Sequence, residues 1–252
     1  SGLVGSEMCI RDRNDVVVAS IFVNPLQFGP GEDYEAYPRT LEADAALAGA
    51  AGVSIIFAPS VEEMYPDGDP LIRISSGELG TKFEGATRPG HFDGVLAVVN
   101  KFFNIIRPAA GNHPVNAYFG QKDAQQYILI QRMVRDFNHD VTMRPVAIVR
   151  EDNGLALSSR NSYLSDEERE SALVLSRTLA MLRENSLNRG FHEIDLDGAR
   201  ERINSTPGVR LDYLELVDPM TFGEPTEESE RVLALVAAFV GPTRLIDNMD
   251  LR

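Results

Sequence analysis

The sequence predicts an α/β protein in which a parallel sheet covered by helices is followed by a smaller α+β domain. Three observations support this prediction. Residues 16–23 form a continuous, β-branched apolar run, which is typical of a strand buried on both faces of a parallel sheet. Similar runs alternate with helical patterns up to about residue 150, as in βαβ units. Beyond that residue the pattern changes to two helices followed by three strands, which indicates a second domain.

Turn and capping residues mark where the predicted elements begin and end. Asn24 and Pro25 end the first strand, and Gly120 separates an apolar strand from an amphipathic helix. The sequence Ser-Asp-Glu-Glu at residues 165–168 is a capping box that opens a long helix. An Asp-Asn-Gly turn at residues 152–154 predicts a hairpin. In chain order we predict strands at residues 16–23, 53–58, 72–74, 115–119, 141–149, 209–217, 231–240 and 243–248, and helices at residues 41–51, 95–106, 127–137, 165–182 and 195–203.

The composition excludes several classes of function. A chain of 252 residues with 43% hydrophobic residues can bury a large core. The net charge of −14 argues against a nucleic-acid or anionic-membrane partner, because both need a basic surface. Cys9 is the only cysteine, which excludes a disulfide framework and fits a reducing compartment. The sequence has no apolar run of membrane length and no signal-peptide core, so we expect a cytoplasmic protein.

The turn at Gly120 is a candidate phosphate site. Unpaired backbone N–H groups and the positive end of the helix dipole favour an anion there, and Lys122 adds a full charge. Of the 24 lysines and arginines only three are lysines, Lys82, Lys101 and Lys122. A second polar cluster, at residues 157–161, follows the next predicted strand. The alternative is that Lys122 is simply solvated, as a lysine in a turn often is.

Two further groups of polar residues are candidates for substrate contacts. Asn24 and Gln27 lie just beyond the carboxyl end of the first strand, where open α/β sheets bind ligands. Glu84, Arg88 and His91 lie in a glycine-punctuated loop before a predicted helix, and polar loops often carry sites. Alternatively, Asn24 only begins a proline turn, and His91 only caps or packs at the start of its helix.

Five segments occur in a fixed order and carry a family resemblance. They are residues 22–28 (Phe-Val-Asn-Pro-Leu-Gln-Phe), 84–92 (Glu-Gly-Ala-Thr-Arg-Pro-Gly-His-Phe), 119–126 (Phe-Gly-Gln-Lys-Asp-Ala-Gln-Gln), 154–161 (Gly-Leu-Ala-Leu-Ser-Ser-Arg-Asn) and 212–215 (Asp-Tyr-Leu-Glu). Together they resemble the pantothenate synthetase family, from about residue 14 to the C-terminus. The resemblance implies a Rossmann-like nucleotidylyltransferase sheet with a C-terminal α+β lid. It also implies a cytoplasmic homodimer that condenses pantoate with β-alanine, using ATP and Mg²⁺, through a pantoyl adenylate, and releases AMP and diphosphate.

The same resemblance assigns roles to individual residues. ATP would be bound by Gly120, Gln121, Lys122, Asp123, Val149, Leu157, Ser158, Ser159 and Arg160, of which Lys122, Ser158, Ser159 and Arg160 would be catalytic. Pantoate and β-alanine would be bound by Gln27, Gln126, Asn24, Tyr37, Glu84, Arg88 and His91, and Asp44 would contact the metal.

One segment departs from the family pattern. Family members begin with a strand that leads into a His-x-Gly-His turn, whose histidines contact the ATP phosphates. None of the four histidines, His91, His113, His139 and His192, lies in such a turn. We therefore expect residues 1–13 to be a disordered or unrelated leader, residues 14–149 to be a Rossmann-like domain without its first strand and helix, and residues 150–252 to be the α+β domain. Two hypotheses follow: an active synthetase, or an impaired fragment that retains only partial nucleotide binding.

Overall fold

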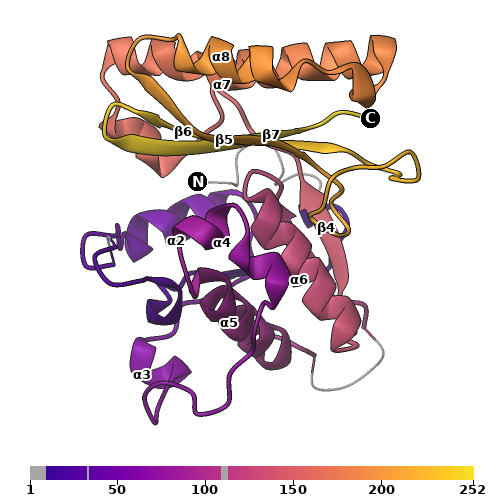
Figure 1. Ribbon diagram of the computed structural model, residues 1–252. Coiled ribbons are helices and arrows are strands. Elements are labelled where there is room, and N and C mark those ends of the chain that lie inside the picture. The colour runs from indigo at the N-terminus through magenta and orange to yellow at the C-terminus, as the bar shows by residue number, and fades with distance from the viewer. Residues whose placement is uncertain (1–9, 33, 109–112) are drawn as a thin grey trace. The chain divides into compact units, whose positions relative to one another are not determined.

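The computed structural model describes residues 10–32, 34–108 and 113–252, so most of the expected leader lies outside the described residues (Figure 1). The chain divides into two compact units. The N-terminal unit contains the described residues up to Phe119 together with Gln125–Val146, and the C-terminal unit contains Gly120–Ala124 and Ala147–Arg252. The functional division into domains at residues 14–149 and 150–252 stays a prediction.

The N-terminal unit contains two strand pairs. Strand β1 (Val18–Ser20) pairs in parallel with β2 (Ile55–Phe57), and helix α2 (Leu41–Ala50) connects them, which confirms the predicted βαβ order. Strand β3 (Asn116–Gly120) pairs with β4 (Thr142–Val146), and α6 (Ala124–Asp136) connects these two.

The strands of this unit are shorter and more exposed than the sequence predicted. No residue of β1, β2, β3 or β4 is buried, so the prediction of strands buried on both faces is wrong here. Each strand pairs on one side only within the described part of the chain, and the burial of its side chains depends on which elements cover its two faces. The predicted strand at residues 72–74 is also wrong, because no described strand pairs with this segment and it stays irregular.

The core of the N-terminal unit lies around α5 (His91–Ile105). The apolar face of this helix packs with α6 and with α3 (Val61–Met64). The helix begins four residues before the predicted start, directly after Gly90, which has a left-handed φ of 82°. Further short helices that precede α5 are η1 (Pro25–Gln27), η2 (Glu78–Thr81) and α4 (Glu84–Thr87).

Gly94 allows α5 to approach η1 closely. A Cβ atom at this position would lie 2.2 Å from the carbonyl oxygen of Leu26. We expect Gly94→Ala to lower the free energy of unfolding of the N-terminal unit by about 1 to 3 kcal/mol, since backbone has to move. Gly49→Ala is the matched control, because Gly49 is also helical and its Cβ would meet nothing within 4 Å. Hydrogen exchange of the α5 amides measures the effect, and equal protection in both variants would contradict it.

The C-terminal unit is a three-stranded antiparallel sheet covered by two helices. Strands β5 (Val209–Val217), β6 (Leu233–Val240) and β7 (Thr243–Asp250) are ordered β5-β6-β7. Helices α7 (Asp166–Arg189) and α8 (Leu196–Asn204) lie on one face of this sheet (Figure 1). The large side chains buried in the core of this unit include Leu173, Leu179, Leu182, Ile203, Leu214 and Leu251.

Local signals in the C-terminal unit are confirmed. Ser165 and Glu168 form both bonds of the predicted capping box at the start of α7. The Asp-Asn-Gly turn closes a hairpin with an antiparallel bridge between Arg150 and Ala156. Helices η3 (Ser159–Tyr163) and η4 (Phe191–Glu193) complete the unit. None of the helices in the described residues combines the length and the apolar character needed to cross a membrane.

Candidate active site

Lys122 lies in the turn between β3 and α6, two residues before the helix begins. Its side chain is half-buried, and no ion pair of its ammonium group is found within the described residues. A helix N-terminus already attracts anions through its free N–H groups and its dipole. A half-buried cation with no ion pair among the described residues strengthens that preference, so this turn is suited to bind a phosphate.

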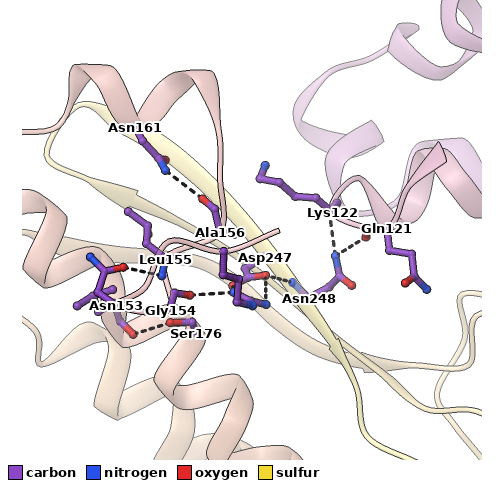
Figure 2. Close-up of polar contacts among 12 residues, drawn as sticks. Gln121, Lys122, Asn153, Gly154, Leu155, Ala156, Asn161, Ser176, Asp247 and Asn248 are labelled. Carbon is purple, nitrogen blue, oxygen red and sulfur yellow. Dashed lines mark hydrogen bonds and ion pairs between the residues drawn. The ribbon is translucent and has the colours of Figure 1, made fainter. Parts of the chain in front are cut away.

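A pocket of the C-terminal unit brings Lys122 together with Ser158. Its polar lining also includes Asn161 and Asp247. In Figure 2 the Lys122 side chain extends from its turn toward the segment that carries Ala156 and Asn161. The remaining lining is mostly apolar and comes from Leu155, Ala156, Ala172, Leu175, Ser176, Leu245 and Ile246.

The segment that carries Ser158 is shaped by local hydrogen bonds. The Ser158 hydroxyl caps η3 by accepting the backbone N–H of Arg160 at 3.2 Å. Ser159 and Arg160 lie next to it, and Arg160 is exposed, so its guanidinium is free to turn toward a bound anion. Asn161 is buried and donates to the Ala156 carbonyl at 3.0 Å, while its Oδ1 atom has no partner in the described part of the chain.

The other residues assigned to ATP lie in the same unit. Gly120, Gln121 and Asp123 belong to the turn of Lys122. Val149 and Leu157 face each other across the hairpin, and the Leu157 N–H donates to the Val149 carbonyl at 2.9 Å. All nine predicted ATP residues therefore lie in the C-terminal unit, and two of them, Lys122 and Ser158, line one pocket.

In the N-terminal unit, His91 links Gln27 to Arg88. Its Nδ1 atom is 2.8 Å from the Gln27 carbonyl, and its Nε2 atom is 3.1 Å from Nη1 of Arg88. Arginine can only donate, so Nε2 accepts and Nδ1 carries the proton that is donated to Gln27. Burial lowers the pKa of His91 below its ordinary value, which favours this neutral form.

Arg88 is also paired with Glu32. Its Nε and Nη2 atoms donate to the two carboxylate oxygens of Glu32. The hydrogen bond from Arg88 holds the pKa of the Glu32 carboxyl below its usual range. The sequence offered no signal for Glu32, which lies in an irregular loop, so this residue was missed.

Asn24 is a buried residue that holds Gln27 in place. Its amide nitrogen donates to the Gly94 carbonyl at 3.0 Å and to Oε1 of Gln27 at 3.2 Å. Its Oδ1 atom accepts the Tyr65 hydroxyl at 2.8 Å. Burial raises the pKa of Tyr65 to about 12, so the hydroxyl stays protonated and keeps donating. All the hydrogen-bonding atoms of the Asn24 side chain are therefore engaged within the unit.

The remaining predicted substrate residues are Gln126, Tyr37 and Glu84. Gln126 is half-buried, and no hydrogen bond of its side chain is found in the described ranges. Tyr37 is exposed and contacts the Phe28 ring edge-on at 5.8 Å. The backbone N–H of Glu84 donates to the neighbouring Gln125, whose buried amide also donates to the carbonyls of Leu79 and Lys82. Gln125 was missed because two adjacent glutamines look alike in sequence.

The assignment of Asp44 as a metal contact stays a prediction. This residue lies in the first turn of α2 and accepts a hydrogen bond from the Thr40 hydroxyl at 3.2 Å. Across residues 10–32, 34–108 and 113–252 there is no group of three or more histidine, cysteine or acidic side chains that could hold a metal ion. A Mg²⁺ ion usually keeps several water ligands and binds through one or two carboxylates together with substrate phosphates, so a single aspartate such as Asp44 remains a candidate contact.

The lowered pKa of His91 leads to a pH prediction. Below about pH 6.5 the unfolded chain takes up this proton more readily than the folded chain, so stability should fall with falling pH, at most by about 1.4 kcal/mol per pH unit. We expect His91→Asn to reduce this slope between pH 7 and 5.5 in urea unfolding. His113→Asn, at an exposed histidine, is the control. An unchanged slope in His91→Asn would contradict the prediction.

Comparisons with known proteins all indicate one family. The family model described as pantoate-beta-alanine ligase matches residues 8–250. The pantothenate synthetase of Paenarthrobacter aurescens is 52% identical over 250 residues, which cover 95% of this chain and 84% of that protein. The pantothenate synthetase of Corynebacterium glutamicum is also 52% identical, over 100% of this chain and 89% of its own length.

Solved structures agree with this result. The crystal structure of pantothenate synthetase from Thermus thermophilus has a TM-score of 0.88 at 46% identity and covers 99% of this chain and 88% of its own. A pantoate-β-alanine ligase from Francisella tularensis, complexed with β-γ ATP and β-alanine, has a TM-score of 0.77 at 34% identity, covering 99% and 84%. These likenesses confirm the predicted Rossmann-like fold class with a smaller α+β domain. The chain therefore belongs to the pantoate-β-alanine ligase family.

Proposed function

We propose that this chain condenses pantoate with β-alanine in an ATP-dependent reaction that passes through a pantoyl adenylate. The observation that carries the proposal is the half-buried Lys122, whose ammonium group has no ion pair within the described residues and which lines a pocket with Ser158 beside a helix N-terminus. Family membership supports the reaction, and the Francisella relative is complexed with β-γ ATP and β-alanine.

The first step requires positive charge at the phosphates. A carboxylate oxygen of pantoate attacks the α-phosphorus of ATP, and the bond to the leaving diphosphate breaks. Negative charge grows on the phosphate oxygens during this step, so fixed cations and donors there lower the barrier. Lys122 and Arg160 supply the cations, and Ser158, Ser159 and the turn N–H groups supply donors. Mg²⁺ would enter bound to the ATP phosphates, as it commonly does in phosphoryl-transfer sites, and Asp44 would contact it.

The second step requires a bound amine and the exclusion of water. The β-alanine nitrogen attacks the acyl carbon, the C–N bond forms, and AMP leaves while the amine loses a proton. Gln27 and Gln126 bind pantoate through their amides, and Gln27 also serves β-alanine. Asn24 and His91 complete this pocket by fixing Gln27 and Arg88, and Tyr37 and Glu84 line it. An enclosed site protects the adenylate from hydrolysis.

Two assays on the purified chain test this proposal. Exchange of labelled diphosphate into ATP should require pantoate, because only adenylate formation is reversed in that assay. AMP release at a steady rate should require β-alanine in addition. Exchange that does not depend on pantoate, or AMP release that does not depend on β-alanine, would mean that another acid or another amine is used. The absence of both activities in a folded, ATP-binding sample would favour a nucleotide-binding fragment instead.

The proposal includes a homodimer in the cytoplasm. The single cysteine and the use of ATP support that location. Leu71 and Ile72 are 100% and 91% exposed, and neighbouring apolar side chains this exposed are typical of an association surface. A second copy of the chain is the simplest partner, since two-fold dimers are the commonest assemblies.

A double substitution tests the assembly. We expect Leu71→Asp with Ile72→Asp to convert a dimer into a monomer in sedimentation experiments, because each carboxylate would be desolvated at the interface. Leu187→Asp, at an exposed leucine of α7, is the control and should leave the mass unchanged. A dimer that persists in the double variant would rule out this surface.

A further inference from the structure

We propose that Asn248, held by Asp247 and Arg150, is a positioning residue that aims the turn of Lys122 at the phosphates of the nucleotide. The inference rests on the proposed ATP site and adds three residues to it. None of the three lies in the five segments that carry the family resemblance.

Asn248 binds the two carbonyl groups of the turn at once. Its side-chain nitrogen is 2.9 Å from the oxygen of Gln121 and 2.9 Å from that of Lys122 (Figure 2). In a trans peptide the N–H of each residue points opposite to the carbonyl of the residue before it. The N–H groups of Lys122 and Asp123 are therefore directed away from Asn248. One side-chain amide thus turns two backbone donors toward the side on which an anion can bind.

Asp247 holds Asn248 and is itself held by Arg150. One oxygen of Asp247 accepts the backbone N–H of Asn248 at 2.8 Å. Both oxygens accept the fork of Arg150, at 2.7 and 3.0 Å, and the exposed fractions of the two side chains are 4% for Asp247 and 24% for Arg150. Two parallel hydrogen bonds from one guanidinium fix the orientation of the Asp247 carboxylate as well as its distance from Arg150.

Arg150 extends this connection to the hairpin before Ser158. Its Nη1 atom also donates to the Gly154 carbonyl at 3.1 Å. The same guanidinium therefore binds the tip of the hairpin and, through Asp247 and Asn248, the turn of Lys122. Lys122, Ser158 and Asp247 line one pocket, so this chain of bonds spans the pocket that they form.

Stability alone does not account for this arrangement. An apolar pair of similar size commonly holds a buried strand as well as an ion pair does, because desolvating two charges is unfavourable. An apolar pair could not donate to the two carbonyls of the turn. The polar residues additionally determine which way the N–H groups of the turn point, and this direction matters for binding an anion.

The test is calorimetric titration of Asn248 variants with ATP and magnesium chloride. Asn248→Ala removes both donors and should weaken ATP binding by about tenfold. Asn248→Asp should weaken it further, because a carboxylate oxygen then faces two carbonyl oxygens. Asp250→Asn is the control. Asp250 lies on the same strand as Asn248 and forms an exposed ion pair with Arg231, and the variant that loses this pair should bind ATP like the parent chain.

A positioning role also predicts non-additive effects. If Asn248 places the whole turn, adding Asn248→Ala to Lys122→Ala should weaken ATP binding less than it does in the parent chain, because the ammonium group that the turn carries is already gone while its backbone N–H groups remain. A merely structural role would lower thermal stability and give additive losses in ATP affinity. Additive losses, or parent-like ATP affinity in both Asn248 variants, overturn the inference.

The design separates this inference from the proposed function. If Lys122→Ala weakens ATP binding and the Asn248 variants do not, the ATP site stands and the positioning role is wrong. If Lys122→Ala also binds ATP like the parent, the ATP site itself is wrong, and the positioning role fails with it.

Should Asn248→Ala not fold, Arg150→Lys provides the test. A lysine keeps a positive charge beside Asp247, but its single ammonium group cannot replace all three bonds of the guanidinium, two to the Asp247 carboxylate and one to the Gly154 carbonyl. Weaker ATP binding is therefore expected, and unchanged binding overturns the inference.

Discussion

Replacing Lys122 with alanine is expected to lower the pantoate-dependent exchange of diphosphate into ATP by about a hundredfold or more, while the fold stays intact. The ammonium group lies in a pocket with Ser158 and is half-buried without an anionic partner in the described part of the chain. Its removal therefore breaks no ion pair among the residues that the structure describes. The loss should fall on the transition state, where charge on the phosphate oxygens is greatest.

The matched control for this prediction is Lys101→Ala. Lys101 is also half-buried, but its ammonium group lies over the ring of Tyr65, 5.4 Å from the ring centre. Its loss should affect the exchange rate little. Lys122→Arg separates charge from shape, and partial activity in that variant would show that positive charge is the main requirement. A parent-like exchange rate in Lys122→Ala would exclude the assigned role of this residue.

Local chemistry explains which parts of the fold were predictable. The capping box of α7 depends on side chains three residues apart, and both of its bonds are present. The end of α7 was placed too early, because the apolar repeat stops at Leu182 while the helix continues to Gly190, where φ is 90°. The extra turns are largely polar and exposed, so the apolar pattern gave no signal for them.

Long-range pairing explains the predictions that failed. An edge strand at residues 72–74 would need a partner strand, and an alternating pattern cannot reveal whether one exists. The run at residues 16–23 has the composition of a buried strand, yet only Val18–Ser20 forms β1, and none of it is buried. Burial depends on what covers a strand, and that is decided elsewhere in the chain.

In the candidate site, too, residues with a local sequence signal were predicted and residues that depend on long-range contacts were not. Lys122 and Ser158 were predicted from residue type and from their place after predicted strands. Asn248 was not, because its contact with Lys122 joins residues 126 positions apart and depends on where β7 places that side chain. Asp247 likewise looked like an ordinary polar residue near the end of a strand. Residues that act through others carry no motif of their own.

Arg88→Ala is expected to have the second-largest effect, on both stability and substrate binding. The substitution removes the two guanidinium donors of the Glu32 carboxylate and the donor that Nε2 of His91 accepts from. Breaking a fully buried pair costs about 3 to 5 kcal/mol. These two side chains are still 23% and 24% exposed, so water compensates in part, and we expect a loss of about 1 to 2 kcal/mol in the N-terminal unit. Because His91 and Arg88 both contact Gln27, the KM for pantoate or β-alanine should rise as well.

The pH dependence identifies Glu32 as the cause of the loss in stability. Arg88 lowers the pKa of Glu32 in the folded chain, so this pair stabilises the fold above about pH 4.5, and the contribution disappears as the pH falls through the folded value. The difference in unfolding free energy between parent and Arg88→Ala should therefore be largest near pH 7 and should shrink in acid. Glu32→Gln should remove most of that pH dependence, whereas Arg132→Ala, which breaks the exposed pair with Asp136, should change stability little. A difference between parent and Arg88→Ala that stays constant into acid would mean that Arg88 acts by packing alone, and that its pairing with Glu32 does not stabilise the residues around Gln27.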